Sequence, residues 1–191
     1  FGLGLGVKLT SSHLKQFASS ARLQFFSLEL DEGLITYAQQ SGKHPLLESL
    51  TKKQTDGLTY YHGQDGPHQL TILLGDARET LYGAMREGFL PPIDAVYQDA
   101  FSPRKNPALW TVEWFKLVRS LCTKDAILTT YSASQSMRKA LLAAGFGVES
   151  VKGMAHKKQA TIAYPYTDGD LELKAQLEKA KLAPMTDEDL K

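Results

Sequence analysis

The segment 93–110, IDAVYQDAFSPRKNPALW, constrains the fold more than any other part of this sequence. It begins as a short apolar run of the kind that forms a buried parallel strand. The run leads to Asp99, and Pro103 and Pro107 follow shortly after it. Proline cannot donate to a sheet and disfavours helix in the residue before it, so a stiff turn is expected here. Asp99 is therefore expected at the carboxyl end of a strand, the edge of an open α/β sheet where ligands bind.

Strand-like and helix-like segments alternate along the chain, which predicts an α/β fold with a mostly parallel sheet. Apolar runs predict further strands over residues 23–30, 69–74, 126–132, 147–152 and 159–164. Amphipathic or capped segments predict helices over residues 7–18, 32–40, 45–53, 75–87, 107–121, 132–144 and 171–182. The last two strands are close in sequence and predict an antiparallel hairpin at the sheet edge. The turn-rich segment 55–68 is interpreted as a surface loop or hairpin.

The chain opens with alternating glycines, Gly2, Gly4 and Gly6, directly before a helical pattern. Such a turn lets the backbone approach a ligand closely, and a helix N-terminus favours polar or anionic groups. A strand normally precedes such a turn, so the first and usually central strand of the sheet is expected to be missing from this chain. The alternative is a glycine-rich tail that binds nothing.

Acidic residues lie at the expected tips of the next two strands. Glu29 follows the glycine turn at the distance typical of a carboxylate that binds the ribose hydroxyls of a nucleoside cofactor. Its alternative role is an ordinary solvated acidic turn. Asp76, before Ala77, stands where a helix cap is expected and could also accept from the amino group of an adenine ring.

The length of 191 residues suits one domain with a substantial core, and 42% of the residues are apolar. No apolar run is long enough for a membrane span, and no signal-peptide pattern is present. The single cysteine, Cys122, is consistent with a reducing cytoplasm, and the five histidines show no metal-ligand spacing. We therefore expect a cytoplasmic protein without a metal site. A net charge of +1 means that any nucleic-acid partner would have to be held by local basic patches.

The order of elements resembles a class I S-adenosylmethionine-dependent methyltransferase, a Rossmann-like fold, that lacks its first strand. Three segments make the resemblance more specific: DAFSPRKNPALWT, TYSASQSMRKALLAAGF and KGMAHKKQATIA. They are similar to the methyltransferase domain of the enzymes that make 5-methylaminomethyl-2-thiouridine in tRNA. The similarity covers residues 1–164, and Gly6 stands where the family usually has Asn.

This resemblance implies a methyltransferase domain over residues 1–166, followed by a charged tail over residues 167–191. The implied reaction is N-methylation of 5-aminomethyl(-2-thio)uridine at the wobble position, in the anticodon loop of a tRNA. In bifunctional relatives the domain is joined to a flavin-dependent oxidase domain, so a separate oxidase acting in the same pathway is a possible partner. The alternatives are methylation of another amine, or a cofactor-binding module without turnover.

The resemblance also implies roles for individual residues. Cofactor contacts are assigned to Phe1, Gly2, Gly4, Glu29, Asp76, Ala77 and Asp99. Asp99 is the catalytic candidate, either accepting the proton of the amine or holding that amine in place; its alternative role is bracing a loop. Substrate contacts are assigned to Phe101, Ser102, Pro103, Lys105, Asn106, Trp110 and Lys157; the alternative role of Trp110 is an ordinary core aromatic. Phosphate contacts are expected from Arg104, Lys105, Arg138, Lys139, Lys152, Lys157 and Lys158; the alternative for each is an ordinary solvated surface charge.

Overall fold

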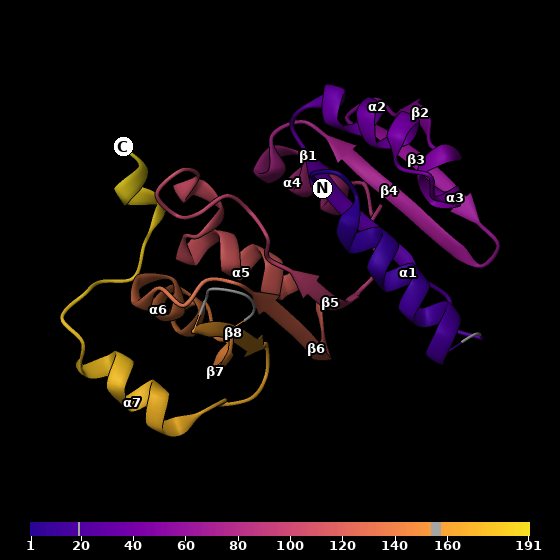
Figure 1. Cartoon of the computed structure of the whole chain (residues 1–191). Helices are drawn as coiled ribbons and strands as arrows, with labels where there is room; N and C mark the ends of the chain where they lie inside the picture. Colours follow the sequence, from indigo (N-terminus) through magenta and orange to yellow (C-terminus); the bar gives the residue numbers. More distant parts are fainter. Residues whose placement is uncertain (19, 154–157) are drawn as a thin grey trace. The chain divides into compact units, whose positions relative to one another are not determined.

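The computed structural model describes residues 1–18, 20–153 and 158–191 (Figure 1). The chain divides into two compact units, Phe1–Phe89 and Leu90–Lys191. Each unit has its own four-stranded sheet with helices packed against it.

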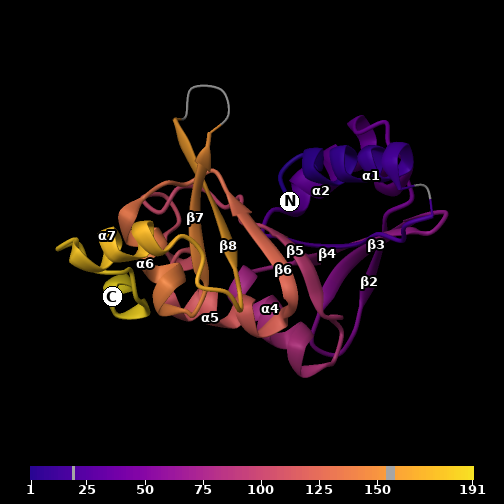
Figure 2. The same cartoon turned by 90° about the horizontal axis from the view of Figure 1, so that it is seen from below.

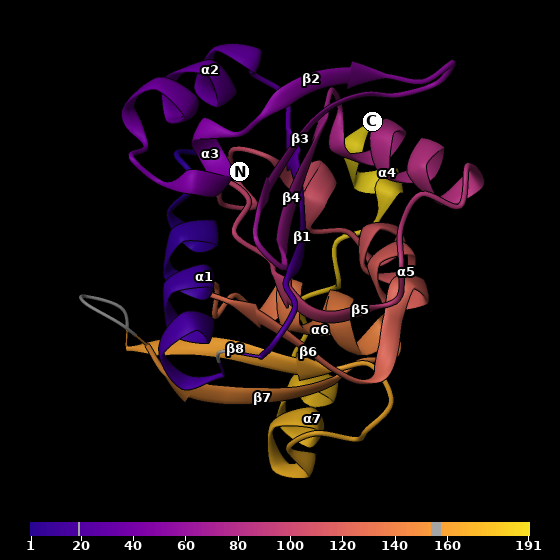
Figure 3. The same cartoon turned by 90° about the vertical axis from the view of Figure 1, so that its right-hand side faces the viewer.

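The first unit carries an N-terminal helix followed by a mixed sheet. Its helices are α1 (Leu5–Phe17), α2 (Glu32–Ser41), α3 (Pro45–Glu48) and α4 (Ala77–Arg86), and its strands are β1 (Gln24–Glu29), β2 (Thr51–Gln54), β3 (Thr59–Asp65) and β4 (His68–Leu74). The strand order is β1-β4-β3-β2, with β1 and β4 parallel and the other two pairs antiparallel. Helices α1 and α2 lie on one face of this sheet and α4 on the other (Figures 2 and 3).

The core of the first unit forms between the sheet and the helices on one of its faces. Its fully buried side chains include Val7, Ile35, Leu46, Leu70 and Ile72. They come from helices and strands alike, and full burial of a side chain of this size stabilises a fold by about 1.5–3 kcal/mol. Val7 thus fixes α1 beside the strands that carry the acidic tips.

One expectation for this unit was wrong. The helix expected over 45–53 ends at Glu48, and residues 51–54 form β2 instead. Of the two interpretations of segment 55–68, the hairpin is confirmed, because this segment contains β3, which pairs antiparallel with both β2 and β4. Strand β3 forms because alternate residues of the segment turn toward the core. Tyr61 is buried there, and Gly63 lies against the Leu46 carbonyl oxygen, which a Cβ at this position would approach to 2.5 Å. Pairing with β4 therefore outweighs the turn-forming composition.

The second unit has the parallel strand pair predicted from the sequence, and the terminal hairpin. Its strands are β5 (Ile93–Tyr97), β6 (Cys122–Thr130), β7 (Gly147–Lys152) and β8 (Gln159–Tyr164). Its helical segments are η1 (Pro107–Leu109), α5 (Val112–Leu121), α6 (Gln135–Ala143), α7 (Leu171–Lys179) and η2 (Asp187–Leu190). The order is β5-β6-β8-β7, with β5 and β6 parallel and the other pairs antiparallel. The expected antiparallel hairpin over 147–152 and 159–164 is confirmed.

The expectation of a mostly parallel sheet was wrong, since each sheet has one parallel and two antiparallel pairs. The physical reason lies in the connections. Short turns can join only antiparallel neighbours, and β2, β3 and β4 follow one another through such turns. The α/β class is as expected, and α5 provides the helical connection between the parallel strands β5 and β6.

The helix expected over 107–121 is divided into η1 and α5. Thr111 separates them, because its hydroxyl accepts from the Trp114 N–H at 3.1 Å and caps α5. The side chain of Trp110, just before this cap, is fully buried. Its ring packs edge-on against Phe115 and Tyr131, with centroids 6.4 and 6.1 Å away. This aromatic cluster joins α5 to the end of β6.

The charged segment 167–191 is part of the second unit and packs against its other elements. Leu177 of α7 is buried, and Gly169 pairs with Val148 in an isolated bridge. Further along, the Val112 N–H donates to the Met185 carbonyl oxygen at 2.9 Å. Among the residues that the structure describes, no helix is long and apolar enough to cross a membrane.

Candidate cofactor and acceptor sites

The glycine turn and Glu29 meet at the end of β1. Gly2 and Gly4 have φ angles of +58° and +70°, the left-handed region that glycine adopts readily. The Gly2 N–H donates to Oε2 of Glu29 at 3.1 Å, while Oε1 accepts from the N–H groups of Leu30 and Asp31 at 2.9 and 3.0 Å. The carboxylate therefore fixes the glycine turn to the strand tip.

Asp76 lies at the tip of the neighbouring strand. The Gly75 N–H donates to the Glu29 carbonyl oxygen at 2.9 Å, which holds the ends of β1 and β4 side by side. Asp76 follows Gly75 and is exposed. The glycine turn, Glu29 and Asp76 thus lie at the carboxyl edge of the parallel pair β1/β4, the edge expected for ligand binding.

Asp76 also caps helix α4, which begins at Ala77. Its Oδ1 accepts from the N–H groups of Arg78 and Glu79 at 2.9 and 3.2 Å. Both roles considered for Asp76 are compatible, because a carboxylate has about four lone-pair sites and capping uses Oδ1.

The strand ends of the first unit fit a nucleoside cofactor. A Cβ built on Gly2 would meet no atom within 4 Å, so the backbone there borders open space. Oε2 of Glu29 accepts from the Gly2 N–H and also lies 3.6 Å from the amino group of Phe1. The carboxylate side chain of Glu29 is only 11% exposed, so its direction is fixed by the backbone groups around it.

In the second unit, Asp99 lies two residues beyond the end of β5. Its side chain is exposed, and its N–H donates to the Tyr97 carbonyl oxygen at 3.0 Å, which turns the chain out of the sheet. The strand-end position expected from the sequence is therefore what the structure shows. A carboxylate in this position can accept a hydrogen bond or a proton from a ligand.

Gln98 anchors the residue before Asp99. Its backbone N–H donates to the Thr129 carbonyl oxygen at 2.9 Å, continuing the ladder with β6. Its buried amide donates through Nε2 to the Leu109 carbonyl oxygen at 2.7 Å and accepts from Nε1 of Trp114 at 3.2 Å. No role was expected for Gln98, although a polar residue ending an apolar strand, with two tryptophans downstream, was a usable signal.

The turn after Asp99 presents several of the predicted substrate residues. Phe101 is 73% exposed, and Ser102 and Pro103 are half-buried. The Ser102 carbonyl oxygen accepts from the N–H groups of Lys105 and Asn106 at 2.7 and 2.9 Å, so the turn is closed through backbone atoms. The side chain of Lys105 is exposed and that of Asn106 is half-buried.

Trp110 differs from its predicted role. Its ring is inside the core of the second unit, so the structure does not support a direct substrate contact. Instead, its indole N–H donates to the Phe101 carbonyl oxygen at 2.8 Å. Trp110 thereby supports the turn that carries Phe101.

Two of the basic residues expected to contact phosphate are engaged within the protein. Arg138 is buried, and its guanidinium donates to Thr161, Ser150 and Ala160. Lys139 donates from Nζ to the Ala180 carbonyl oxygen at 2.8 Å. Both residues lie on α6 and face the β7/β8 hairpin or the C-terminal segment, so their side chains bind protein groups there instead of phosphate. The remaining basic residues divide by exposure: Arg104, Lys105, Lys152 and Lys158 are exposed, and Lys157 lies outside the described residues.

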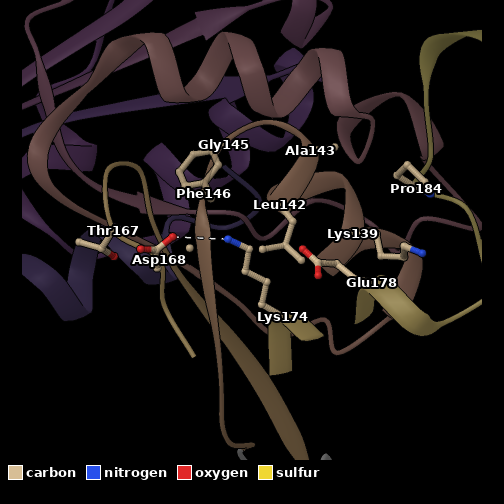
Figure 4. A pocket seen from close by; sticks show the side chains of 11 residues that line it. Lys139, Leu142, Ala143, Gly145, Phe146, Thr167, Asp168, Lys174, Glu178 and Pro184 are labelled. Atoms are coloured by element: carbon tan, nitrogen blue, oxygen red, sulfur yellow. Dashed lines mark hydrogen bonds and ion pairs between the residues drawn. The ribbon is translucent and has the colours of Figure 1, made fainter. Parts of the chain in front are cut away.

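A separate pocket of about 440 Å³ lies between α6, α7 and the turn before β7 (Figure 4). Its lining includes Phe146, Lys174 and Glu178, and Lys174 pairs with Asp168 at 3.4 Å. Apart from Lys139, whose Nζ is bonded to a backbone carbonyl, its lining contains none of the residues predicted for the site. The described part of the chain has no group of three His, Cys, Asp or Glu side chains that could hold a metal ion.

Comparison with known proteins identifies the family. Residues 38–165 match the model of a family described as S-adenosyl-L-methionine-dependent methyltransferase. The chain is 33% identical over 169 residues to the tRNA 5-methylaminomethyl-2-thiouridine biosynthesis bifunctional protein MnmC of Azoarcus sp., a match that covers 83% of this chain and 26% of that protein. It is 29% identical over 170 residues to the MnmC protein of Marinomonas sp., covering 85% and 25% respectively. The chain thus spans about a quarter of the length of these curated relatives.

A solved structure shows the same fold. The crystal structure of MNMC2 from Aquifex aeolicus matches with a TM-score of 0.73 and 27% identity, covering 100% of this chain and 60% of that one. The resemblance found from the sequence motifs is therefore confirmed. Since the family model extends from within α2 to just beyond β8, this chain belongs to that family of S-adenosyl-L-methionine-dependent methyltransferases.

Proposed function

We propose that this protein transfers a methyl group from S-adenosylmethionine to the primary amine of 5-aminomethyl(-2-thio)uridine at the wobble position of a tRNA. The names of the MnmC relatives support this class of substrate. The structural observation that carries the proposal is the turn after β5, which is held by the side chains of Trp110 and Tyr131 while Asp99 and Phe101 stay exposed.

The proposed cofactor site consists of Phe1, Gly2, Gly4, Glu29, Asp76, Ala77 and Asp99. Gly2 and Gly4 provide close backbone approach, and Glu29 accepts from the ribose hydroxyls. Asp76 accepts from the adenine amino group while it caps α4.

In the proposed mechanism the protein orients an amine. When bound, S-adenosylmethionine supplies a methyl group activated by its sulfonium. Asp99 accepts a hydrogen bond from the neutral amine, which directs the nitrogen lone pair at the methyl carbon. As the N–C bond forms and the S–C bond breaks, the nitrogen becomes cationic, and Asp99 then accepts its surplus proton. Alignment of this kind supplies up to about 7–11 kcal/mol of barrier reduction in favourable cases.

The acceptor base is proposed to enter a slot formed by Phe101, Ser102, Pro103, Asn106 and Lys105. A base in an anticodon loop can be unstacked at low cost and stacked on an aromatic ring, and Phe101 is exposed for that purpose. Arg104, Lys105, Lys152, Lys157 and Lys158 are proposed to contact phosphates.

The wider setting is proposed from the same resemblance. The methyltransferase domain comprises residues 1–166, and the charged residues 167–191 form a C-terminal extension. The protein acts in the cytoplasm, and a separate flavin-dependent oxidase acts on the same tRNA position.

The test is methyl transfer from labelled S-adenosylmethionine to tRNA that lacks this modification. We expect the wild-type protein to label the tRNA, and Asp99→Asn to lose about 100-fold or more of the rate, as for loss of a general base. Calorimetric binding of S-adenosylmethionine should persist in that variant. Asp94→Asn is the matched control, because Asp94 lies at the other end of β5 and accepts from Thr123 at 3.0 Å.

Each outcome has a definite meaning. Transfer only to small amines would overturn the tRNA assignment. Unchanged turnover in Asp99→Asn would remove Asp99 from the reaction. Binding without any transfer would make the protein a cofactor-binding module.

A further inference from the structure

Two consecutive carbonyl groups after Asp99 are each held by an aromatic donor. The Tyr131 hydroxyl donates to the Ala100 carbonyl oxygen at 2.9 Å, and the Trp110 indole N–H donates to the Phe101 carbonyl oxygen at 2.8 Å. The two rings also contact each other, with centroids 6.1 Å apart and planes at 76°. We call Tyr131 and Trp110 the aromatic clamp.

The clamp acts on a segment outside the sheet ladder. Hydrogen bonds to the carbonyls of Ala100 and Phe101 come from side chains at the ends of other elements, β6 and η1. Each bond of this type contributes about 0.5–1.5 kcal/mol net and removes alternative backbone conformations. The clamp therefore restricts the peptide planes that follow Asp99.

The peptide before Asp99 is restricted from the other side. Gln98 is fixed by its backbone bond to Thr129 and by its amide bonds to Leu109 and Trp114. Asp99 is thus the exposed member of a segment whose neighbours are held on both sides. The fixed backbone on both sides of Asp99 therefore limits the directions in which its carboxylate can point.

Tyr131 is placed to affect Asp99 through the backbone that follows it. It follows β6, the parallel neighbour of β5, so both residues lie at the carboxyl edge of that pair. Burial first, and the nearby negative charge of Asp99 second, raise the pKa of Tyr131. The hydroxyl therefore stays protonated and remains a donor to Ala100 at neutral pH.

We propose that Tyr131 is a positioning residue for methyl transfer, which acts through Ala100 and Trp110 to direct Asp99 and Phe101 toward the acceptor. This inference rests on the proposed function. A displacement of about 1 Å at a reacting group costs on the order of 100-fold in rate. Loss of one of the two clamp bonds should therefore reduce turnover much more than it weakens cofactor binding, because the other proposed cofactor contacts do not depend on the clamp.

The test compares Tyr131→Phe with Tyr164→Phe. Tyr164 lies in the same unit, is half-buried and donates to Oε2 of Glu149 at 3.4 Å, so the control also removes a bonded hydroxyl. We expect Tyr131→Phe to lower kcat about 10- to 100-fold, with a much smaller change in the KM for S-adenosylmethionine. Tyr164→Phe should keep kcat within about twofold. An equal loss of kcat in both variants would overturn the inference.

Two further measurements separate positioning from other roles. The pH profile of kcat should keep its shape in Tyr131→Phe, and loss of one limb would instead make Tyr131 a proton-transfer group. Because Tyr131 and Trp110 act on the same turn, Trp110→Phe and Tyr131→Phe should combine non-additively. Additive losses would overturn the shared clamp.

Hydrogen exchange tests the clamp independently of any substrate. Peptides that cover residues 99–106 should exchange at least about threefold faster in Tyr131→Phe than in the wild type, and should be unchanged in Tyr164→Phe. Unchanged exchange in Tyr131→Phe would overturn the inference even if the enzyme methylates tRNA. Failure of the wild type to methylate tRNA would overturn the proposed function, and the exchange result would still decide whether the clamp exists.

Discussion

Arg138 donates from Nε to the hydroxyl oxygen of Thr161 at 2.9 Å in the interior of the second unit. Its Nη2 donates to the hydroxyl of Ser150 and the carbonyl oxygen of Ala160, at 3.0 and 3.1 Å. Thr161 in turn donates to the Ser132 carbonyl oxygen at 2.6 Å, which connects the hairpin to the turn after β6. These partners are all neutral, and burial lowers the pKa of Arg138.

Arg138→Lys should destabilise the protein more than Arg138→Met. Lysine keeps a buried positive charge but lacks the planar fork that reaches Thr161, Ser150 and Ala160 together, whereas methionine removes the charge. We expect Arg138→Lys to lose about 1–3 kcal/mol in urea unfolding. Arg104→Lys, at an exposed position, is the control. Greater stability of the lysine variant than of the methionine variant would contradict this account.

Gly4→Ala should weaken both the fold and cofactor binding. Gly4 has φ +70°, and a Cβ there would lie 3.1–3.2 Å from Phe1 and Leu47. The left-handed conformation alone costs a residue with a Cβ about 1–2 kcal/mol. Gly6→Ala is the control, because its nearest atom would be 3.9 Å away and alanine favours the helix. Thermal unfolding and calorimetric titration with S-adenosylmethionine measure the two effects, and equal behaviour of the two variants would argue against a special role for Gly4.

Glu32→Gln should remove a pH-dependent part of the stability. Hydrogen bonds from Lys52 and Tyr61, both at 2.6 Å, lower the pKa of Glu32 below its usual 4.5. A lowered pKa in the folded state stabilises the fold above the unfolded value, and this contribution is lost as the pH falls through the folded value. The wild type should therefore be more stable than Glu32→Gln at neutral pH, and the gap should close on acidification below about 4.5. Urea unfolding across that range checks the sign; a gap that widened in acid would refute it.

Cys122 should be unreactive in the native protein. Burial raises the pKa of its thiol to about 11, so little thiolate exists at neutral pH. The thiol reagent DTNB should label it slowly in buffer and rapidly after unfolding in urea. Rapid labelling of the native protein would show that the strand carrying Cys122 opens readily.

Arg104 and Lys105 should contribute electrostatically to tRNA binding. Replacing both by glutamine should weaken binding and flatten its salt dependence, by about 0.7 in log–log slope for each phosphate that the variant no longer neutralises. Lys124→Gln is the control, since Lys124 is exposed near the start of β6 and pairs with Asp125 at 3.9 Å. An unchanged slope in the double variant would exclude phosphate contacts at this turn.

The α/β class, the strand-end position of Asp99 and the terminal hairpin could all be predicted from the amino-acid sequence. These features depend on local signals: apolar runs, prolines, caps and a short connection between two strands. The family was also readable from contiguous motifs around Asp99. Each of these conclusions needed only residues that are close together in the sequence.

Sheet pairing and the supports of the candidate site became apparent only from the folded chain. Tyr61 and Gly63 make a strand of a turn-rich segment because β4 and α3 lie beside them. Trp110 was expected to contact substrate and Arg138 to contact phosphate. Both side chains are buried, and their polar atoms form hydrogen bonds inside the protein. A residue's own neighbours in sequence do not show which distant carbonyl or hydroxyl its side chain will meet. That depends on long-range packing, which satisfies buried polar groups only once the whole unit is assembled.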